Sequence, residues 1–209
     1  MITQDRRGRQ PTKQRLVEAG MQLFAERGFR QTTVGDIEAA VGLQPRRGAL
    51  YRHFTSKEAL LQTALYERLQ AVDEASEALT QLPLVDLRAE AMAMGAWLLG
   101  ELDRERVIMR IFEHDGDRLV QIRDLFRERV VDAGYRAAAA LARRWLGAAA
   151  DTIDTEALSV VLLGALINYR RSTWTFASPP LQIEDQRFLS CWADLCVSAT
   201  AAVRSHDKD

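Results

Sequence analysis

Apolar residues recur three or four positions apart along most of this chain, which is the spacing of one face of an α-helix. The first such stripe spans residues 12–27, and Gly28 follows it as a helix stop. Thr33 and Asp36 have the spacing of a capping box and open a second, short helix, which Gly42 ends. The pattern therefore predicts two closely joined helices in the first quarter of the chain.

A third short helix is expected to start at Pro45, because proline suits the first helical position, with Leu50 and Phe54 on its buried face. A second capping box at 55–58 then opens a long helix, and Pro83 is expected to separate this helix from the body of the protein. Further helices are predicted near residues 85–102, 105–114, 117–146, 152–177 and 183–204. No strand pattern interrupts them, so the predicted fold is all-α.

The 209 residues are 47% hydrophobic and 27% charged, which is typical of a globular protein and not of a disordered one. The net charge of −1 is unevenly distributed, since residues 1–56 hold ten Lys or Arg against five Asp or Glu. Such a split fits a solvated surface of mixed sign, or a phosphate-binding domain attached to an acidic regulatory body. We expect two domains, one at 1–60 and a helical one at 61–209.

Several classes of protein are disfavoured by what the chain lacks. The apolar run at 157–167 is shorter than the about 20 residues of a membrane span, and no signal peptide is recognisable, so a cytoplasmic protein is expected. Cys191 and Cys196 are expected to be core thiols and not a disulfide or a zinc site.

An all-helical metalloenzyme is the rival from another class, and the sequence disfavours it. There is no Glu-x-x-His, and neither cysteine has a histidine nearby in the sequence. An acidic cluster beside Gly116 is expected to be solvated and not to bind a metal; its members are Glu113, His114, Asp115 and Asp117. We therefore expect neither enzymatic activity nor a cofactor.

The two short helices around Gly42, followed by a basic segment, have the layout of a helix-turn-helix that reads DNA. Leu50 and Phe54 would anchor the second helix of the pair, and its opposite face would offer hydrogen-bond donors to bases and phosphates. The donors are Arg46, Arg47, Tyr51, Arg52 and His53.

Residues 12–60 resemble the TetR family of transcriptional regulators. The resemblance rests on Thr32–Val34, Ile37, Gly42–Leu43, Gly48–Phe54 and Ser56–Leu60 at their fixed spacings. The chain departs from the family pattern at Glu38 and Val41, where alanine is usual, and its stretch from Gly42 to Gly48 is two residues longer. These departures bear on the start and tilt of the recognition helix.

The resemblance implies a set of DNA-contacting residues. Thr33, with Thr32 beside it, would contact phosphate at the start of the second helix, and Tyr51, His53 and Lys57 would bind phosphates too. The major groove would be faced by Arg46, Arg47, Gly48 and Ala49. Alternatively, Tyr51 and His53 are half-buried and close the small core. Arg6, Arg7 and Arg9 would form either a DNA-contacting arm or a solvated one.

The resemblance also implies that the C-terminal domain binds a small molecule and dimerises. The expected effector contacts are Trp97, Met109, Phe112, Asn168, Tyr169, Arg170 and Trp174, and plain core packing is the alternative for each. A flat or greasy ligand is expected, anionic if Arg170 or Arg171 turns inward. The expected dimer contacts are Leu158, Leu162, Ala165, Trp192, Leu195 and Ala199, which could instead serve the subunit core.

Together these features predict a homodimeric repressor that occupies a palindromic operator in double-stranded DNA until a small molecule releases it. The alternative is a constitutive or architectural DNA-binding dimer without an effector, because pockets in this fold consist of ordinary core residues.

Overall fold

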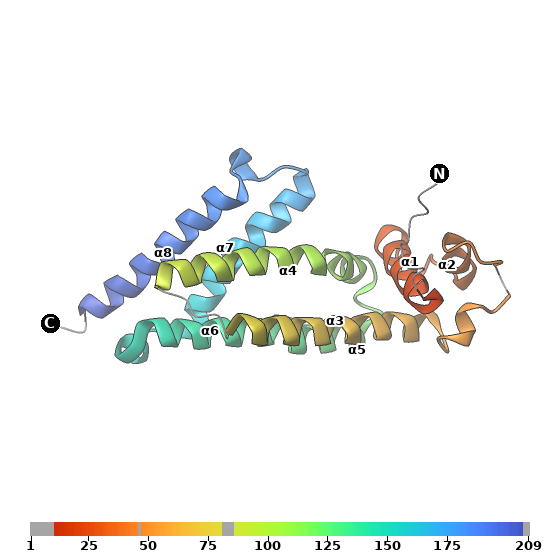
Figure 1. Cartoon of the computed structure of the whole chain (residues 1–209), viewed down its shortest axis with the longest axis horizontal. Coiled ribbons are helices and arrows are strands. Elements are labelled where there is room, and N and C mark those ends of the chain that lie inside the picture. Colours follow the sequence, from red (N-terminus) through yellow and green to blue (C-terminus); the bar gives the residue numbers. More distant parts are fainter. Residues whose placement is uncertain (1–10, 46, 81–85, 207–209) are drawn as a thin grey trace, which may run out of the picture. The chain divides into compact units, whose positions relative to one another are not determined.

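The computed structural model describes residues 11–45, 47–80 and 86–206, which form helices and turns without a strand (Figure 1). The helices are α1 Thr12–Arg27, α2 Val34–Ala40, α3 Lys57–Thr80, α4 Leu87–Asp115, α5 Val120–Phe126, α6 Ala133–Leu146, α7 Thr155–Phe176 and α8 Asp185–His206. A π-helical segment at Arg127–Asp132 joins α5 to α6, and 3-10 turns lie at Leu50–Arg52, Gly147–Thr152 and Pro180–Gln182. The all-α prediction is confirmed. Within the described ranges, no helix is both long and apolar enough to cross a membrane.

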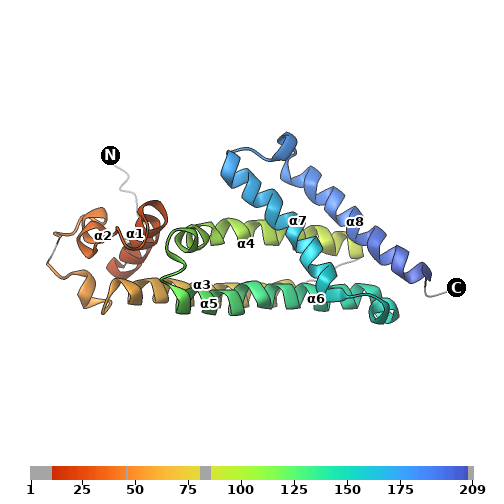
Figure 2. The same cartoon turned by 180° about the vertical axis from the view of Figure 1, so that it is seen from behind.

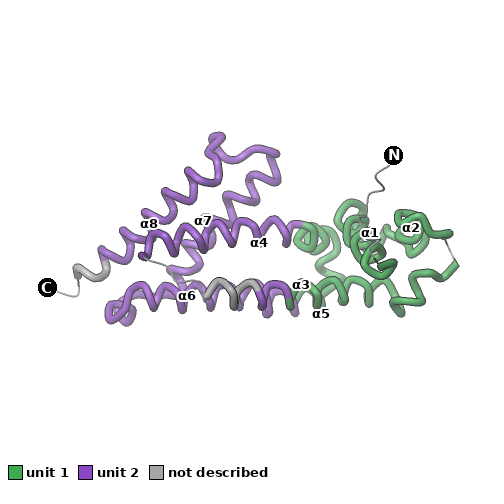
Figure 3. The backbone as a smooth tube through the Cα atoms, viewed as in Figure 1, with its two compact units in different colours: residues 1–70, 107–124 green, residues 71–106, 125–209 purple. Residues whose placement is uncertain are grey.

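The chain divides into two compact units, which Figure 3 colours separately. Residues 1–70 and 107–124 form the first unit, and residues 71–106 and 125–209 form the second. The boundary expected at residue 60 does not coincide with this division, because α3 continues past it and the end of α4 joins the first unit.

The first unit is built around the packing of α1 on α2 and α3, and both opposite views place α1 and α2 beside the start of α3 (Figures 1 and 2). Phe24 and Ile37 are fully buried here. Gly20 allows the close approach, since a Cβ atom at this position would lie 2.9 Å from a methyl group of Leu60. As predicted, Gly28 ends α1: its φ is 87° and its N–H donates to the carbonyl oxygen of Phe24.

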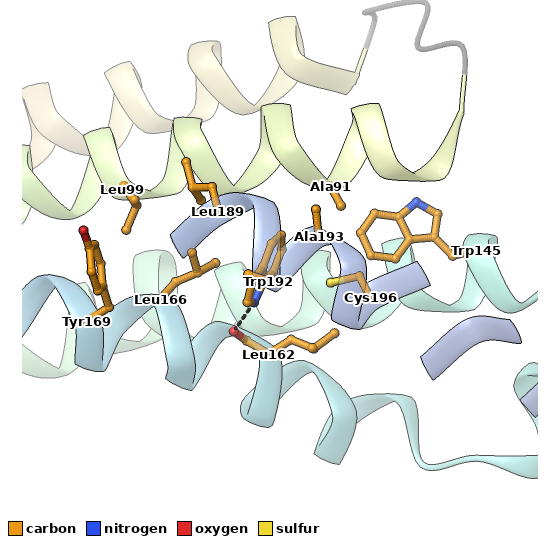
Figure 4. Packing of buried hydrophobic residues seen from close by; sticks show 10 residues of the cluster. All are labelled: Ala91, Leu99, Trp145, Leu162, Leu166, Tyr169, Leu189, Trp192, Ala193 and Cys196. Atoms are coloured by element: carbon orange, nitrogen blue, oxygen red, sulfur yellow. Dashed lines mark hydrogen bonds between the residues drawn. The ribbon is translucent and has the colours of Figure 1, made fainter. Parts of the chain in front are cut away.

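The core of the second unit joins α4, α6, α7 and α8 (Figure 4). Trp192 of α8 lies at its centre, and its Nε1 donates a hydrogen bond of 2.9 Å to the carbonyl oxygen of Leu162 on α7. Trp145 of α6 donates its indole N–H to the side-chain carboxylate of Glu90 on α4, also at 2.9 Å. Both indole donors are therefore satisfied, as buried tryptophans require.

Two sequence predictions about the helices are wrong in detail, and so is the expectation that Cys191 is a core thiol. The helices expected at 85–102 and 105–114 are one helix, α4, because the polar residues between them are compatible with a helix and no Gly or Pro breaks it there. α3 is capped by Ser56, whose Oγ accepts the N–H of Ala59, and not by Thr55. Cys196 is buried, which raises the pKa of its thiol to about 12, whereas Cys191 is exposed.

Candidate nucleic-acid interface

The start of α2 carries the capping box that the sequence predicts. The Thr33 hydroxyl accepts the N–H of Asp36 at 3.2 Å, and the Asp36 carboxylate accepts the N–H of Thr33 at 2.8 Å. Hydrogen bonds from the Thr33 side chain and backbone hold the pKa of Asp36 below its usual value. Thr33 is exposed, so the capped N-terminal turn of α2 is open to a phosphate group.

The recognition segment is not the continuous helix expected from Pro45. Gly48 has a φ of 71°, a left-handed conformation that interrupts a right-handed helix at this residue. Helical backbone starts only after it, as one 3-10 turn from Leu50 to Arg52. The described residues between Gly42 and Gly48, which are 43–45 and 47, are likewise not helical.

The residues of this short turn face in two directions. Leu50 and Phe54 are buried, as predicted, and fasten the turn to the core of the first unit. Tyr51 is 59% exposed, and Arg52 and His53 are exposed too. The alternative in which Tyr51 and His53 are half-buried and close the core is therefore wrong.

Other residues predicted to contact the DNA bases lie just before this turn. Arg47 is exposed, and Gly48 and Ala49 are partly exposed. Arg46 lies outside the described residues, as do the three arginines Arg6, Arg7 and Arg9.

Thr32 and Lys57 hold the backbone of the first unit. Thr32 has no exposed surface, and its hydroxyl donates to the carbonyl oxygens of Leu23 and Gly28 at 3.2 and 2.9 Å. The prediction that Thr32 contacts DNA is wrong for this reason. The Lys57 ammonium donates to the carbonyl oxygens of Phe29 and Thr32 at 2.7 and 3.1 Å, so two of its three N–H groups serve the α1–α2 connection.

The sequence analysis missed the backbone contacts of two acids in the first unit, Glu38 and Asp115, and its expectation that Asp115 is solvated is wrong. Glu38 of α2 is fully buried, and its Oε1 accepts the backbone N–H of Leu50 at 3.0 Å. Asp115, at the end of α4, accepts the backbone N–H of Phe29 at 2.6 Å. For Glu38 the available signal was its place next to Ile37, which is on the buried face of α2. The sequence does not show which backbone group such an acid reaches.

Several residues expected to bind an effector are engaged in a polar network of the second unit. Tyr169 stacks on Phe188 with centroids 4.0 Å apart and donates to the Asp185 carboxylate at 2.8 Å. Burial, together with this bond, raises the pKa of Tyr169 to about 12. Burial by itself would raise the pKa of Asp185, but hydrogen bonds from Arg170 and Tyr169 outweigh it and hold that pKa below its usual value.

The same network reaches α4. Arg170 is buried and lies 2.7 Å from Asp185 and 3.6 Å from Asp103, whereas Arg171 is exposed. Trp174 donates its indole N–H to Asp103 at 2.9 Å. Only Arg170 of the two adjacent arginines turns inward, and two carboxylates already lie beside its charge.

The remaining expected effector residues are dispersed. Trp97 is partly buried in the second unit, and Asn168 of the same unit is exposed. Met109 and Phe112 belong to the first unit. The seven residues are therefore not gathered within one compact unit.

The expected dimer residues divide into three groups by their exposure. Leu162 and Trp192 are buried in the core of their own subunit and are bonded to each other, so their assignment to an interface is wrong. Leu158, Ala165 and Ala199 are partly buried. Leu195 is 54% exposed, and Val160 and Val161 of α7, which the sequence analysis missed, are 53% and 66% exposed.

The contacts of Lys57 generate a test of its structural role. Lys57→Met keeps the aliphatic stem but removes both hydrogen bonds, so it is expected to lower the free energy of unfolding by about 1–3 kcal/mol in urea titrations. Lys13→Met is the control, because the half-exposed Lys13 lies 4.0 Å from Glu67 and 5.8 Å from the Phe54 ring centroid, both long contacts, and should change stability by less than about 1 kcal/mol. Equal stability of Lys57→Met and the parent would contradict the assignment.

Comparison with known proteins agrees with this geometry. The sequence profile of "Bacterial regulatory proteins, tetR family" matches residues 16–64. The HTH-type transcriptional regulator UidR of Escherichia coli (strain K12) is 33% identical over 84 residues, which are 40% of this chain and 42% of that protein. The HTH-type transcriptional repressor DhaR of Mycobacterium sp. (strain GP1) is 49% identical over 51 residues, 24% of this chain and 25% of that one. The matches thus span less than half the length of these relatives.

Solved structures extend the likeness of fold to most of the chain. A TetR-like transcriptional regulator from Rhodococcus sp. RHA1 matches with a TM-score of 0.67 and 18% identity, covering 92% of this chain and 99% of that one. The fatty acid degradation regulator FadR from Bacillus halodurans matches with a TM-score of 0.63 and 15% identity over 90% of this chain and 95% of that one. At such identities the likeness concerns the fold. The profile match and the related regulators thus show TetR-family sequence in the N-terminal part of the chain, at residues 16–64, and the solved structures show the same fold over most of its length.

Proposed function

We propose that this protein is a DNA-binding transcriptional regulator that acts as a repressor. The observation that carries the proposal is the short turn at Leu50–Arg52, which presents exposed polar side chains on a buried base. The regulators of this family are non-enzymatic, and DhaR is named a repressor. A regulator of this kind works where the DNA is, so we place the protein in the cytoplasm.

The proposed DNA contacts follow from which side chains are exposed. Arg47 and Arg52 offer guanidinium donors to base edges and phosphates, and Arg46 is expected to act with them. Tyr51 and His53 offer donors to the phosphate backbone. Thr33 presents the capped start of α2, where backbone N–H groups favour an anion.

The exposed apolar residues of α7 and α8 support a homodimer. Val160, Val161 and Leu195 expose large apolar side chains on the two helices that the family resemblance assigns to dimerisation. A two-fold dimer would carry two recognition turns and bind two half-sites of a palindromic operator, about 34–36 Å apart.

The proposed regulation is release from DNA by a small molecule, and we propose that α4 couples ligand binding to DNA binding. This helix holds Asp103 in the polar network of the second unit, and its end, Asp115, bonds to Phe29 in the first unit. A ligand that rearranges the Asp103 contacts would therefore act on a helix that also holds the DNA-binding unit. Because the carboxylates of Asp103 and Asp185 lie beside Arg170, this network offers no net positive charge that would favour an anionic ligand.

The proposed DNA contact is tested by selecting a binding sequence from random duplexes with the whole protein. Arg47→Ala is expected to weaken binding to the selected duplex by about 1–3 kcal/mol, measured by titration at fixed salt. Arg143→Ala removes an exposed arginine of α6 and should leave this affinity unchanged. Failure to select any sequence, or an equal effect of both changes, would refute the proposed interface.

The proposed dimer is tested by light scattering at micromolar concentration. Val161→Glu and Leu195→Glu are expected to weaken dimerisation at least about 100-fold, because each would bury an unpaired charge in the interface. Val131→Glu changes an exposed valine outside α7 and α8 and should leave the dimer intact. A parent protein that is monomeric under these conditions would overturn the two-half-site mechanism.

The proposed effector site is tested with compounds that both raise the melting temperature and release the selected duplex. Trp174→Ala is expected to abolish release while DNA binding persists, and the active compound should quench the tryptophan fluorescence of the parent. Phe176→Ala is the matched control, because this aromatic residue of α7 is 75% exposed. A normal response of Trp174→Ala would place the pocket elsewhere, and the absence of any releasing compound would favour a constitutive DNA-binding dimer.

A further inference from the structure

Glu38 is a buried acid on the short helix that precedes the recognition turn. Its side chain has no exposed surface, and Oε1 accepts the backbone N–H of Leu50 at 3.0 Å. A buried carboxyl group is unfavourable in an apolar core unless its oxygens find hydrogen-bond donors. The contact therefore joins two segments that are twelve residues apart, at the base of the proposed DNA-binding surface.

The Leu50 N–H, which donates the hydrogen bond to Glu38, lies at the first position of the 3-10 turn. Such groups have no partner inside the turn and usually depend on the side chain of the preceding residue. Here the preceding residue is Ala49, which has no polar side chain and forms no cap. Glu38 thus supplies from α2 the acceptor that the local sequence does not provide.

The backbone before the turn does little to fix its direction. Gly48 is in the left-handed conformation, and the described residues that lead to it, 43–45 and 47, are not helical. A 3-10 turn of three residues is also too short to be stable without tertiary contacts. Two contacts hold its first residue: the Leu50 side chain in the core, and the Leu50 N–H on Glu38.

We propose that Glu38 is the positioning residue of DNA recognition, fixing the orientation of the turn that carries Tyr51, Arg52 and His53. This inference rests on the proposed DNA-binding function and deepens it. Glu38 does not touch DNA, since it is buried beneath the turn. It acts by holding the Leu50 backbone, so that the exposed side chains meet the base edges in one orientation. A turn that is already ordered loses less conformational entropy when it binds DNA.

Two substitutions of similar size separate positioning from stability. Glu38→Gln retains a carboxamide oxygen that can accept the Leu50 N–H, whereas Glu38→Met fills the same space without an acceptor. Glu38→Met removes a buried carboxyl group but leaves the Leu50 N–H without an acceptor, so its melting temperature is expected to fall by about 2–10 °C, and circular dichroism checks that it is folded at the temperature of the DNA titration. A loss of DNA recognition in that variant would not follow from unfolding.

The first measurement is the ratio of affinities for the selected duplex and for a random-sequence duplex at the same salt concentration. Glu38→Met is expected to lower the affinity for the selected duplex about tenfold or more and to leave random-sequence binding nearly unchanged, because the latter depends on phosphate contacts. Glu38→Gln should stay within about threefold of the parent. Ile37→Val, a small core change on the same helix, is the control and should leave the ratio unchanged.

The second measurement is amide hydrogen exchange at Leu50, which needs no DNA. Exchange at this amide is expected to be about tenfold faster or more in Glu38→Met and close to the parent in Glu38→Gln. If the parent selects no DNA sequence, the proposed function fails, and the exchange rates still decide whether Glu38 holds the turn. An unchanged affinity ratio in Glu38→Met, or equal losses in Glu38→Met and Glu38→Gln, would overturn the proposal.

Discussion

The candidate DNA-binding surface depends on the attachment of one very short turn to the core beneath it. A turn of three residues cannot stabilise its own hydrogen bonds, so its order must come from tertiary contacts. Leu50 and Phe54 supply the apolar part of that attachment, and Glu38 supplies the polar part. Everything that is exposed between Leu50 and Phe54 is oriented by these buried groups.

Polar residues of the motif divide into those that face solvent and those that hold the backbone. Thr32 and Lys57 belong to the second kind, since both bond to carbonyl oxygens around the connection between α1 and α2. Asp115 fastens the same connection through the N–H of Phe29. A loop without regular hydrogen bonds needs such partners, because buried backbone groups left unpaired are costly.

In the polar network of the second unit, too, the charged and polar groups are paired with one another. Asp103 and Asp185 flank Arg170, and the indole N–H of Trp174 is bonded to Asp103. The network joins α4, α7 and the start of α8. Because its members balance one another, a ligand that enters here must replace these bonds and not merely add to them.

The sequence alone determined the all-α fold, the bounds of α1 and the capping box of Thr33, because helix spacing, caps and stops are local signals. It did not determine which face of a helix is covered, so Leu162 and Val161 were assigned only by the structure. It also did not reveal the inward role of Lys57 or the acceptor role of Glu38, since their partners are backbone groups that carry no residue-specific signal. Only the tertiary structure decides such contacts, because they depend on where distant backbone segments meet.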